Sequence, residues 1–419
     1  MTLLDVRKAS FILFLCVKTL SFTIIPPTSS RRGWATPTAN SSASWKHDGI
    51  FSPRSQGTSL SVISSAEISS TNRKNTNSEL ESLGIHIPFG LHQKLRLNAQ
   101  EDIRKRFWIV DNSGSMALWD GEHSSLGQTD YCTRWCEVQE TVACHSQLSA
   151  VLGAPTDFTL LNPAKGGPIL RGPQRFRVGY GVNRNQNHVV KDCKRAQSIM
   201  LRNEPTGRTP LSASIKEVRR EIVRMQPELE KIGRKVCLVI ATDGCNYNSQ
   251  NVGLEVNEGE RQQELVEALK SLQGLPVNIV VRLCTNHEPV VDFWNDLDQH
   301  LEGLNLDVLD DHRAEAEEVY QHNPWLNYAL ILHRMREMGQ ECQLFDLLDE
   351  RPFTKEEVRE FCSLLFGVHF NGEINDDNDW KKFIQEVDNL QQLEKMQWNP
   401  RSNALAPWIN TQHLAYVHN

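Results

Sequence analysis

The stretch Phe107-Trp108-Ile109-Val110-Asp111-Asn112-Ser113-Gly114-Ser115 decides the fold, because a short apolar run passes directly into a polar loop. Residues 107–110 are aromatic or β-branched, and basic residues 104–106 precede them, which predicts a fully buried strand. In an open α/β sheet, ligands bind beyond the carboxyl ends of the strands. An aspartate followed by two serines at alternate positions can direct three oxygen atoms to one point. Such oxygen ligands suit a hard divalent cation, above all Mg²⁺.

Two later stretches supply further oxygen ligands at the ends of predicted elements. Thr209-Pro210-Leu211 begins a periodic helix, and we expect the threonine at its N-cap and the proline at its first position. Residues 236–241 are a second predicted buried strand, which Thr242-Asp243-Gly244 follows. The apolar face of the predicted helix consists of Leu211, Ile215, Val218, Ile222 and Met225.

These three loops, in this order, resemble those of a von Willebrand factor type A (VWFA) domain with a metal-ion-dependent adhesion site. The resemblance implies that Ser113, Ser115 and Thr209 offer hydroxyls to the metal, while Asp111 and Asp243 hold it directly or through water. It implies Mg²⁺ as the ion, with Mn²⁺ or Ca²⁺ as alternatives. No motif position departs from the family's pattern, although the stretch between the second serine and the threonine is long enough to suggest an insertion.

The remaining pattern up to residue 311 indicates an α/β domain. We expect helices at 133–152, 189–201, 261–272 and 291–301, and short strands at 158–161, 176–178, 277–283 and 306–309. Helices that alternate with apolar strands indicate βαβ units and a parallel sheet covered on both faces. The resemblance independently implies the family's doubly wound, mostly parallel, Rossmann-like sheet. The resemblance therefore implies that residues 95–311 form a VWFA domain.

After Asp310 no further strands are expected. Helices are predicted at 315–320, 325–338, 354–366 and 380–396, and Thr354 with Glu357 has the spacing of a capping box. Residues 312–419 are therefore expected to form a helical C-terminal extension, either packed on the sheet domain or folded as its own small bundle.

The N-terminal region is predicted to be a targeting segment followed by a linker. Arg7 and Lys8 precede a short apolar core at 11–17, which is typical of a signal peptide, so residues 1–27 are a signal or targeting segment. Targeting to the secretory or endomembrane system is favoured, organelle import comes second, and a segment without a targeting role is the third reading. The core is too short, and too charged at Lys18, for a stable membrane span. Residues 28–94 are a disordered Ser/Thr-rich linker, although 79–99 also has the pattern of an amphipathic lead-in.

The composition, with 39% hydrophobic and 23% charged residues, is that of a soluble globular protein. The net charge of −7 is unevenly distributed, because residues 1–78 contain nine basic and three acidic residues and so carry +6, which leaves −13 for the remainder. A folded region that acidic repels the phosphate backbone, so a nucleic-acid partner is not expected.

Two other groups of possible ligands are less persuasive. Cys132, Cys136 and Cys144-His145 lack the paired short spacings of a structural zinc site, so buried thiols or a local disulfide are expected instead. Asp376-Asp377-Asn378-Asp379 lacks the glycine and glutamate of an EF-hand loop and is expected to be a solvated acidic turn. The tryptophans of 323–325 and 407–409 are expected to anchor packing, with a surface for a partner as the less favoured alternative.

The predicted loops favour binding over catalysis. A phosphatase with an aspartate nucleophile needs a second carboxylate two residues later, where Ser113 stands, and neither serine lies in a Gly-x-Ser-x-Gly setting. We therefore expect no enzyme but a metal-dependent protein-binding module, in which an acidic residue of a partner protein completes the coordination. One alternative is an adaptor subunit of an ATP-driven metal-insertion or remodelling complex, with the ATPase on a separate chain because no Gly-x-x-x-x-Gly-Lys loop occurs. The other is a hydrolase that uses the metal to activate water.

Overall fold

A computed structural model describes residues 80–81, 83–123, 130–163, 174–181, 185–244, 258–301, 303–373 and 375–417. All of them belong to one compact unit that spans residues 60–419. The predicted targeting segment at 1–27 and the linker up to residue 79 lie outside the described residues.

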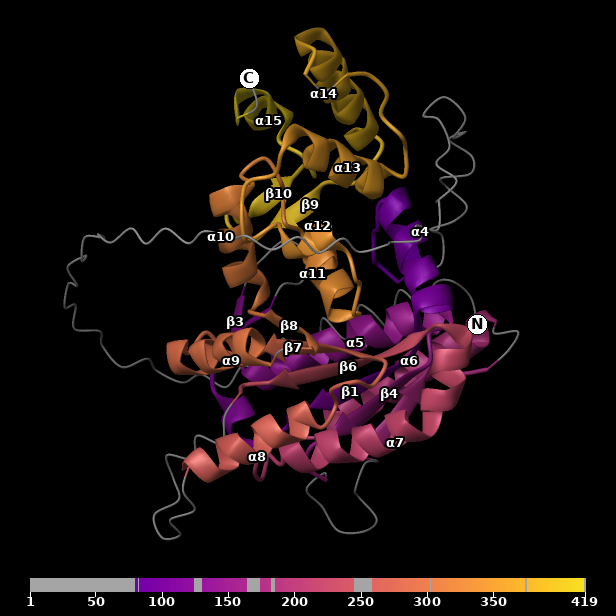
Figure 1. The fold of residues 1–419 in the computed structure, drawn as a ribbon, viewed down its shortest axis with the longest axis vertical. Helices are drawn as coiled ribbons and strands as arrows, with labels where there is room; N and C mark the ends of the chain where they lie inside the picture. The colour runs from indigo at the N-terminus through magenta and orange to yellow at the C-terminus, as the bar shows by residue number, and fades with distance from the viewer. Residues whose placement is uncertain are drawn as a thin grey trace, which may run out of the picture. The chain divides into compact units, whose positions relative to one another are not determined.

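A six-stranded sheet with the order β5-β4-β1-β6-β7-β8 is the centre of this unit. The neighbouring strands β4, β1, β6, β7 and β8 pair in parallel, whereas β5 pairs antiparallel to β4 at the edge. The expectation of an α/β fold with a mostly parallel sheet is therefore confirmed (Figure 1). The strands are β1 Ile103–Val110, β4 Thr156–Leu160, β5 Arg175–Val178, β6 Lys235–Thr242, β7 Val277–Leu283 and β8 Asn305–Leu309.

Helices pack on both faces of the sheet, because the strand side chains alternate between two apolar clusters. Phe107 and Ile109 pack with α7 Leu211–Ile232, α8 Glu258–Lys270 and α9 Glu288–His300. Trp108 and Val110 pack with α5 Arg134–Leu152 and α6 Gln186–Arg202. Figure 1 shows α7 and α8 below the sheet and α5 above it.

Strand β1 begins earlier than predicted. The basic residues 104–106, which were expected to precede the strand, are part of it. Arg106 is fully buried, and its Nε donates to the carbonyl oxygen of Met338 at 3.1 Å while its Nη2 donates to Asn98 Oδ1. Burial lowers the pKa of Arg106 to about 10. An arginine can occupy this buried position because Met338 of the C-terminal region and Asn98, which precedes the sheet, supply acceptors for it.

The N-caps of α7 and α13 show whether two of the predicted helix starts are correct. Helix α7 begins at Leu211 with Pro210 at its N-cap, so Thr209 lies one residue before the cap and its expected N-cap position is wrong. The predicted capping box of Thr354 and Glu357 is confirmed at the start of α13 Lys355–Phe366. Proline pre-sets the backbone but donates no hydrogen bond, so it can stand at either position.

The segment before the sheet is helical within the range that we assigned to the linker. Helix α4 Phe89–Leu97 continues into a π-helical turn, Asn98–Asp102, and it buries Leu91 and Leu95 against the C-terminal helices. Gly90 packs directly on α13, because a Cβ on this residue would lie 2.3 Å from the backbone nitrogen of Gly367. The linker boundary expected at residue 94 is therefore too late.

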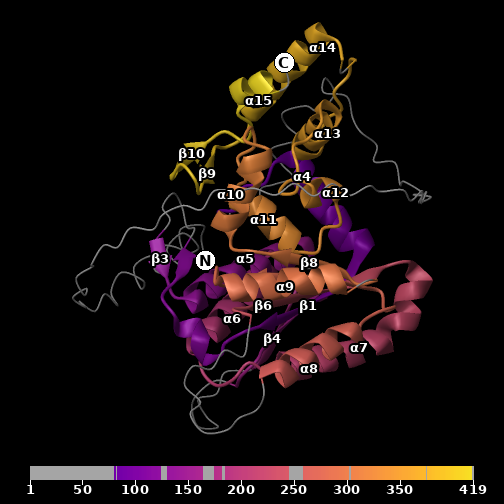
Figure 2. The ribbon, with the colours of Figure 1, turned by 60° about the vertical axis from the view of Figure 1, so that its left-hand side comes forward.

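The C-terminal region contains the predicted helices and also a short hairpin. The strands β9 Gln397–Asn399 and β10 Ala404–Ala406 pair antiparallel, so the expectation of no strands after residue 310 is wrong (Figure 2). Trp325 and Trp408 are buried, which confirms their use in packing. The other helices are α10 His312–His322, α11 Leu330–Glu337, α12 Gln343–Asp346, α14 Asp377–Gln391 and α15 Thr411–Val417.

Buried charges join the C-terminal region to the sheet. Glu337 of α11 is fully buried and accepts two hydrogen bonds from Arg334 Nη1, at 2.6 and 2.8 Å. His145 Nε2 of α5 lies 2.6 Å from Glu337 Oε2, and Arg282 Nε of β7 lies 3.3 Å from Glu337 Oε1. The extension therefore packs on the sheet, which was one of its two expected arrangements.

The remaining described features correct smaller expectations. Strands β2 Gly121–His123 and β3 Asp130–Cys132 form a hairpin that was not predicted. Asp376, which was expected in an acidic turn, is the N-cap of α14 and accepts from the backbone nitrogens of Asn378 and Asp379.

Within the described ranges, no helix is long and apolar enough to cross a lipid bilayer.

Candidate functional site

The first loop of the candidate site holds Asp111 rigidly between two strand ends. Asp111 follows β1 and is fully buried. Its Oδ1 accepts from the backbone nitrogen of Ser113 at 2.8 Å, and its Oδ2 accepts from Thr242 Oγ1 of β6 at 2.7 Å. Each carboxylate oxygen therefore has at least one fixed hydrogen-bond donor.

Ser113 is the N-cap of the tight 3-10 turn Gly114–Ala117, and Ser115 lies within this turn. The Oγ atoms of Ser113 and Ser115 are 3.0 Å apart. Ser113 is buried and Ser115 is half-buried, so these two hydroxyls mark the path from the buried carboxylate to the surface.

Asp243, directly after β6, is also buried. Its Oδ2 accepts from Arg134 Nη1 at 2.9 Å, whereas its Oδ1 is buried without a hydrogen-bond partner among the described residues. Arg134 is the first residue of α5, and its Nε and Nη2 donate to the two carboxylate oxygens of Asp120 at 2.7 and 2.5 Å. One guanidinium thus links the loop after the serines to the second acidic residue.

The two aspartates are close enough to repel each other. Burial, and then the negative charge of Asp243, raises the pKa of Asp111 to about 7. A bound cation would offset both effects, because it favours the charged form of a carboxylate. The raised pKa of Asp111 and the unpartnered Oδ1 of Asp243 are what a site suited to a cation would present, and the surrounding donor set of carboxylate and hydroxyl oxygens fits Mg²⁺.

Thr209 lies in the same pocket as the serines. Ser113, Ser115, Thr209 and Gly244 line a cavity of about 280 Å³ at the carboxyl ends of the strands. Of the five predicted site residues, three therefore line one pocket. The other two are connected to it, since Asp111 is bonded to Ser113 and Asp243 acts electrostatically on Asp111.

Asn112 and Asn162, which the sequence analysis did not single out as site residues, fix the loops to each other. Asn112 Oδ1 accepts from the backbone nitrogen of Asn162 at 2.7 Å, and its Nδ2 donates to the carbonyl oxygen of Asn162 at 3.0 Å. Asn162 Nδ2 in turn donates to the carbonyl oxygen of Arg208 at 2.7 Å. The side chains of Asn112 and Asn162 therefore hold the serine loop and the threonine loop together. The available sequence signal was an asparagine shortly after each of two predicted strands.

Gly207 allows the threonine loop to approach Asn162. Its φ of +82° lies in the left-handed region, and a Cβ would lie 2.6 Å from Asn162 Oδ1. Its carbonyl oxygen accepts from the backbone nitrogen of Gly114 at 3.2 Å, which closes the contact between the two loops. Glycine is required here for both the backbone angle and the space.

Arg134 was also missed by the sequence analysis. A basic residue in the first turn of a helix is disfavoured by the helix dipole, which was the available signal that acidic partners compensate it. The structure supplies these partners as Asp120 and Asp243.

The cysteine and histidine group does not form a zinc site. Cys132, Cys136 and Cys144 are free thiols, and His145 is bonded to Glu337. Throughout the described part of the chain, no three His, Cys, Asp or Glu side chains are grouped as metal ligands. The candidate site differs in kind, because it has two carboxylates and three hydroxyls.

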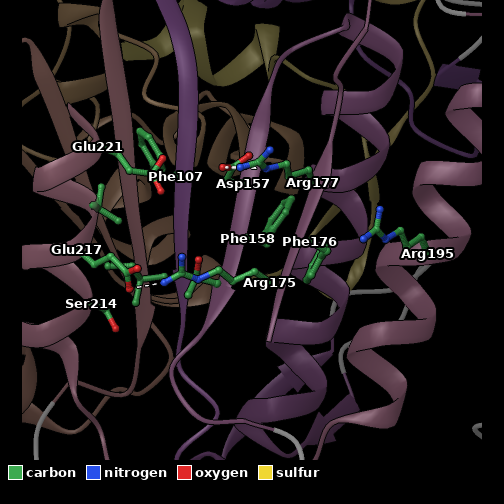
Figure 3. Close-up of a pocket in the computed structure, with 13 residues that line it drawn as sticks. Phe107, Asp157, Phe158, Arg175, Phe176, Arg177, Arg195, Ser214, Glu217 and Glu221 are labelled. Carbon is green, nitrogen blue, oxygen red and sulfur yellow. Dashed lines mark ion pairs between the residues drawn. The ribbon is translucent and has the colours of Figure 1, made fainter. Parts of the chain in front are cut away.

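A second pocket, of about 210 Å³, lies between α7 and the edge strand β5 (Figure 3). Its carboxylates are already paired with cations. Asp157 and Glu221 pair with Lys105 at 2.9 and 3.3 Å, and Glu217 pairs with Arg175. The carboxylates of this pocket are compensated within the protein, so they are less available to a cation than the unpartnered Oδ1 of Asp243.

Comparison with known proteins gives no assignment. No family model matches the sequence, and no curated protein matches it. Among solved structures, a mutant of the PilB minor pilin from Streptococcus sanguinis aligns with a TM-score of 0.33 and 12% identity, over 50% of this chain and 57% of that chain. The PilB minor pilin itself aligns with a TM-score of 0.30 and 13% identity, over 50% and 58%. This chain thus spans less than two thirds of either pilin, and scores this low do not establish a shared fold.

Proposed function

We propose that the sheet domain is of the VWFA type and that its strand-end pocket is a metal-ion-dependent adhesion site. The order of the strands, the antiparallel edge strand and the helices on both faces agree with the doubly wound sheet of that family. The proximity of the serine and threonine loops agrees with its metal site. The function that we propose is metal-dependent binding of another protein, with no bond made or broken.

One observation carries this proposal. Asp111 and Asp243 are buried next to each other, and the Oδ1 of Asp243 has no partner in the described part of the chain. A buried polar atom without a partner costs free energy. A divalent cation held by Asp111, Asp243 and the hydroxyls of Ser113, Ser115 and Thr209 would remove that cost.

The composition of the ligand set suits recognition of an acidic partner. When bound, Mg²⁺ supplies a concentrated positive charge and an open coordination position. Three of the five proposed ligands are neutral hydroxyls, and Arg134 offsets part of the charge of Asp243. The protein therefore leaves positive charge for a carboxylate of the partner, and exclusion of water strengthens that contact.

Thermal unfolding of the full chain in millimolar Mg²⁺ and in EDTA tests the proposal. We expect Mg²⁺ to raise the Tm by about 2 °C or more, because a ligand that binds only the native state stabilises it. Asp111→Ala and Thr209→Val should abolish the shift, and Asp292→Ala, which changes an exposed aspartate of α9, should retain it. Equal Tm values with and without Mg²⁺ in the unmodified chain would reject a metal site.

A further inference from the structure

The mouth of the strand-end pocket is positively charged, although residues 79–419 carry a net charge of −13. Arg208 and Arg261 line the pocket, and neither forms an ion pair with any described residue. The acidic residue that lines the pocket, Glu264, is already paired with Lys216 at 3.1 Å. Two uncompensated guanidinium groups therefore remain beside the proposed metal ligands.

Both arginines are attached to fixed backbone. Arg208 directly precedes Thr209, and its carbonyl oxygen accepts from Asn162 Nδ2 at 2.7 Å. Arg261 lies in the first turns of α8. Because the backbone at both positions is held before any partner arrives, less conformational entropy is lost when their side chains bind.

Two exposed apolar residues follow the serine turn in the chain. Leu118 and Trp119 follow Ser115 closely and are 52% and 71% exposed. The carbonyl oxygen of Leu118 accepts from the backbone nitrogen of Arg134 at 3.1 Å, and the next residue after Trp119, Asp120, holds the guanidinium of the same arginine. Exposed tryptophan on a fixed backbone is typical of the residues that dominate protein interfaces.

We infer that the partner of this site is an acidic protein segment with at least two carboxylates and neighbouring apolar side chains. This inference rests on the proposed function. One carboxylate of the segment completes the metal site, a second pairs with Arg208 and Arg261, and Trp119 contacts the apolar side chains. A single carboxylate would leave both arginines without a counter-charge, and a free phosphate ion would leave Leu118 and Trp119 exposed to water.

Fluorescence anisotropy with the full chain and a defined probe tests the inference. The probe is a fluorescein-labelled hexapeptide of alternating glutamate and leucine, and the reference peptide has serine in place of all but one glutamate. In Mg²⁺ we expect the probe to bind about tenfold more tightly than the reference, because additional charge pairs across an interface are worth about this much. The double variant Arg208→Ser, Arg261→Ser should remove that difference, and Trp119→Ser should weaken both peptides.

Arg195→Ser is the matched control, because Arg195 is also exposed and unpaired within the described residues but belongs to α6. It should bind both peptides as the unmodified chain does. The Tm shift caused by Mg²⁺ should be unchanged in all these variants, which shows that they are folded and that the metal site is intact.

The outcomes separate this inference from the proposed function. If the double arginine variant binds both peptides as the unmodified chain does, the inference is wrong while the metal site stands. The inference is also wrong, while the metal site stands, if inorganic phosphate displaces the probe as readily as free unlabelled peptide does. If binding still depends on the arginines but is the same in EDTA and in Asp111→Ala, the arginine surface stands and the metal site does not.

Discussion

Arg134 and Asp243 form a buried ion pair, with 2.9 Å between the guanidinium Nη1 and the carboxylate Oδ2. The pair joins the start of α5 to the end of β6, and Asp120 completes it from the loop after the serines. The guanidinium of Arg134 thus neutralises part of the negative charge of the site. The negative charge that remains determines how strongly the site can attract a metal ion.

Arg134→Met is predicted to destabilise the protein by about 3 kcal/mol in EDTA, because it leaves the carboxylate of Asp243 buried without a counter-charge. Urea denaturation measures this loss. Mg²⁺ should raise the Tm of the variant more than that of the unmodified chain, since the ion no longer shares Asp243 with a guanidinium. Arg313→Met removes a pair with Glu122 that is more exposed than the Arg134 pair, and it should cost about 1 kcal/mol or less. Equal losses in the two variants would argue against the importance of the buried pair.

Asn112→Ala is predicted to weaken Mg²⁺ binding about tenfold, because residues that hold metal ligands in place typically contribute that much. The substitution removes both side-chain hydrogen bonds to Asn162 and so frees the serine loop from the threonine loop. Isothermal titration calorimetry gives the Kd. Asn187→Ala, at an exposed position of α6, serves as control and should leave the Kd unchanged. An unaltered Kd in Asn112→Ala would show that the asparagine pair does not position the ligands.

The central strands β1, β6 and β7 could be predicted because each contains a run of apolar residues, many of them β-branched. Val277–Leu283 was predicted with its observed bounds, since all seven of its residues are buried. The hairpin of β9 and β10 could not be predicted, because its three-residue strands are exposed or half-buried and show no alternation. Helix α11 was predicted to begin at Trp325 but begins at Leu330. Within the residues that precede the helix, the backbone of Leu326 forms a β-bridge with Ile409. The local sequence pattern gives no sign of this contact.

For the candidate site, the sequence pointed to the loops and their oxygen-bearing side chains but not to the contacts that hold the loops together. The motif placed Asp111 and Asp243 at strand ends, and two parallel neighbouring strands necessarily bring those ends close. Arg134 reaches Asp243 across 109 positions of chain through the packing of α5 on the sheet. Contacts of this kind depend on tertiary structure, so a single sequence gives no direct signal for them.

Glu337→Gln is predicted to lower the free energy of unfolding by about 3 kcal/mol, since it removes the negative charge that Arg334 and His145 share. Chemical denaturation of the full chain measures the change. Glu360→Gln, at an exposed position of α13, provides the comparison and should change the stability by less than about 0.5 kcal/mol. A loss in Glu337→Gln no larger than in this control would mean that the buried network does not stabilise the junction.

The protein is predicted to lose stability as the pH falls from about 6.5 to about 4, in part through His312. Burial lowers the pKa of His312 to about 4, whereas in the unfolded chain the histidine has its ordinary pKa of about 6.5. The unfolded state therefore binds more protons in this window, and acid favours it. His312→Gln, which can still donate to the carbonyl oxygen of Tyr328, should flatten the decline in urea-denaturation measurements. His369→Gln, at an exposed position, should not; an equally steep decline in both variants would exclude His312 as the cause.

The proposed metal site is tested most directly by counting bound ions. Electron paramagnetic resonance of the full chain titrated with Mn²⁺ reports the free ion, because the signal of the bound ion is broadened. We expect one tightly bound Mn²⁺ per chain, competed by Mg²⁺, and none in the variant Asp111→Ala, Asp243→Ala. A chain that binds no Mn²⁺, or a variant that binds it as the unmodified chain does, would contradict the assignment of Asp111, Ser113, Ser115, Thr209 and Asp243 as the metal ligands.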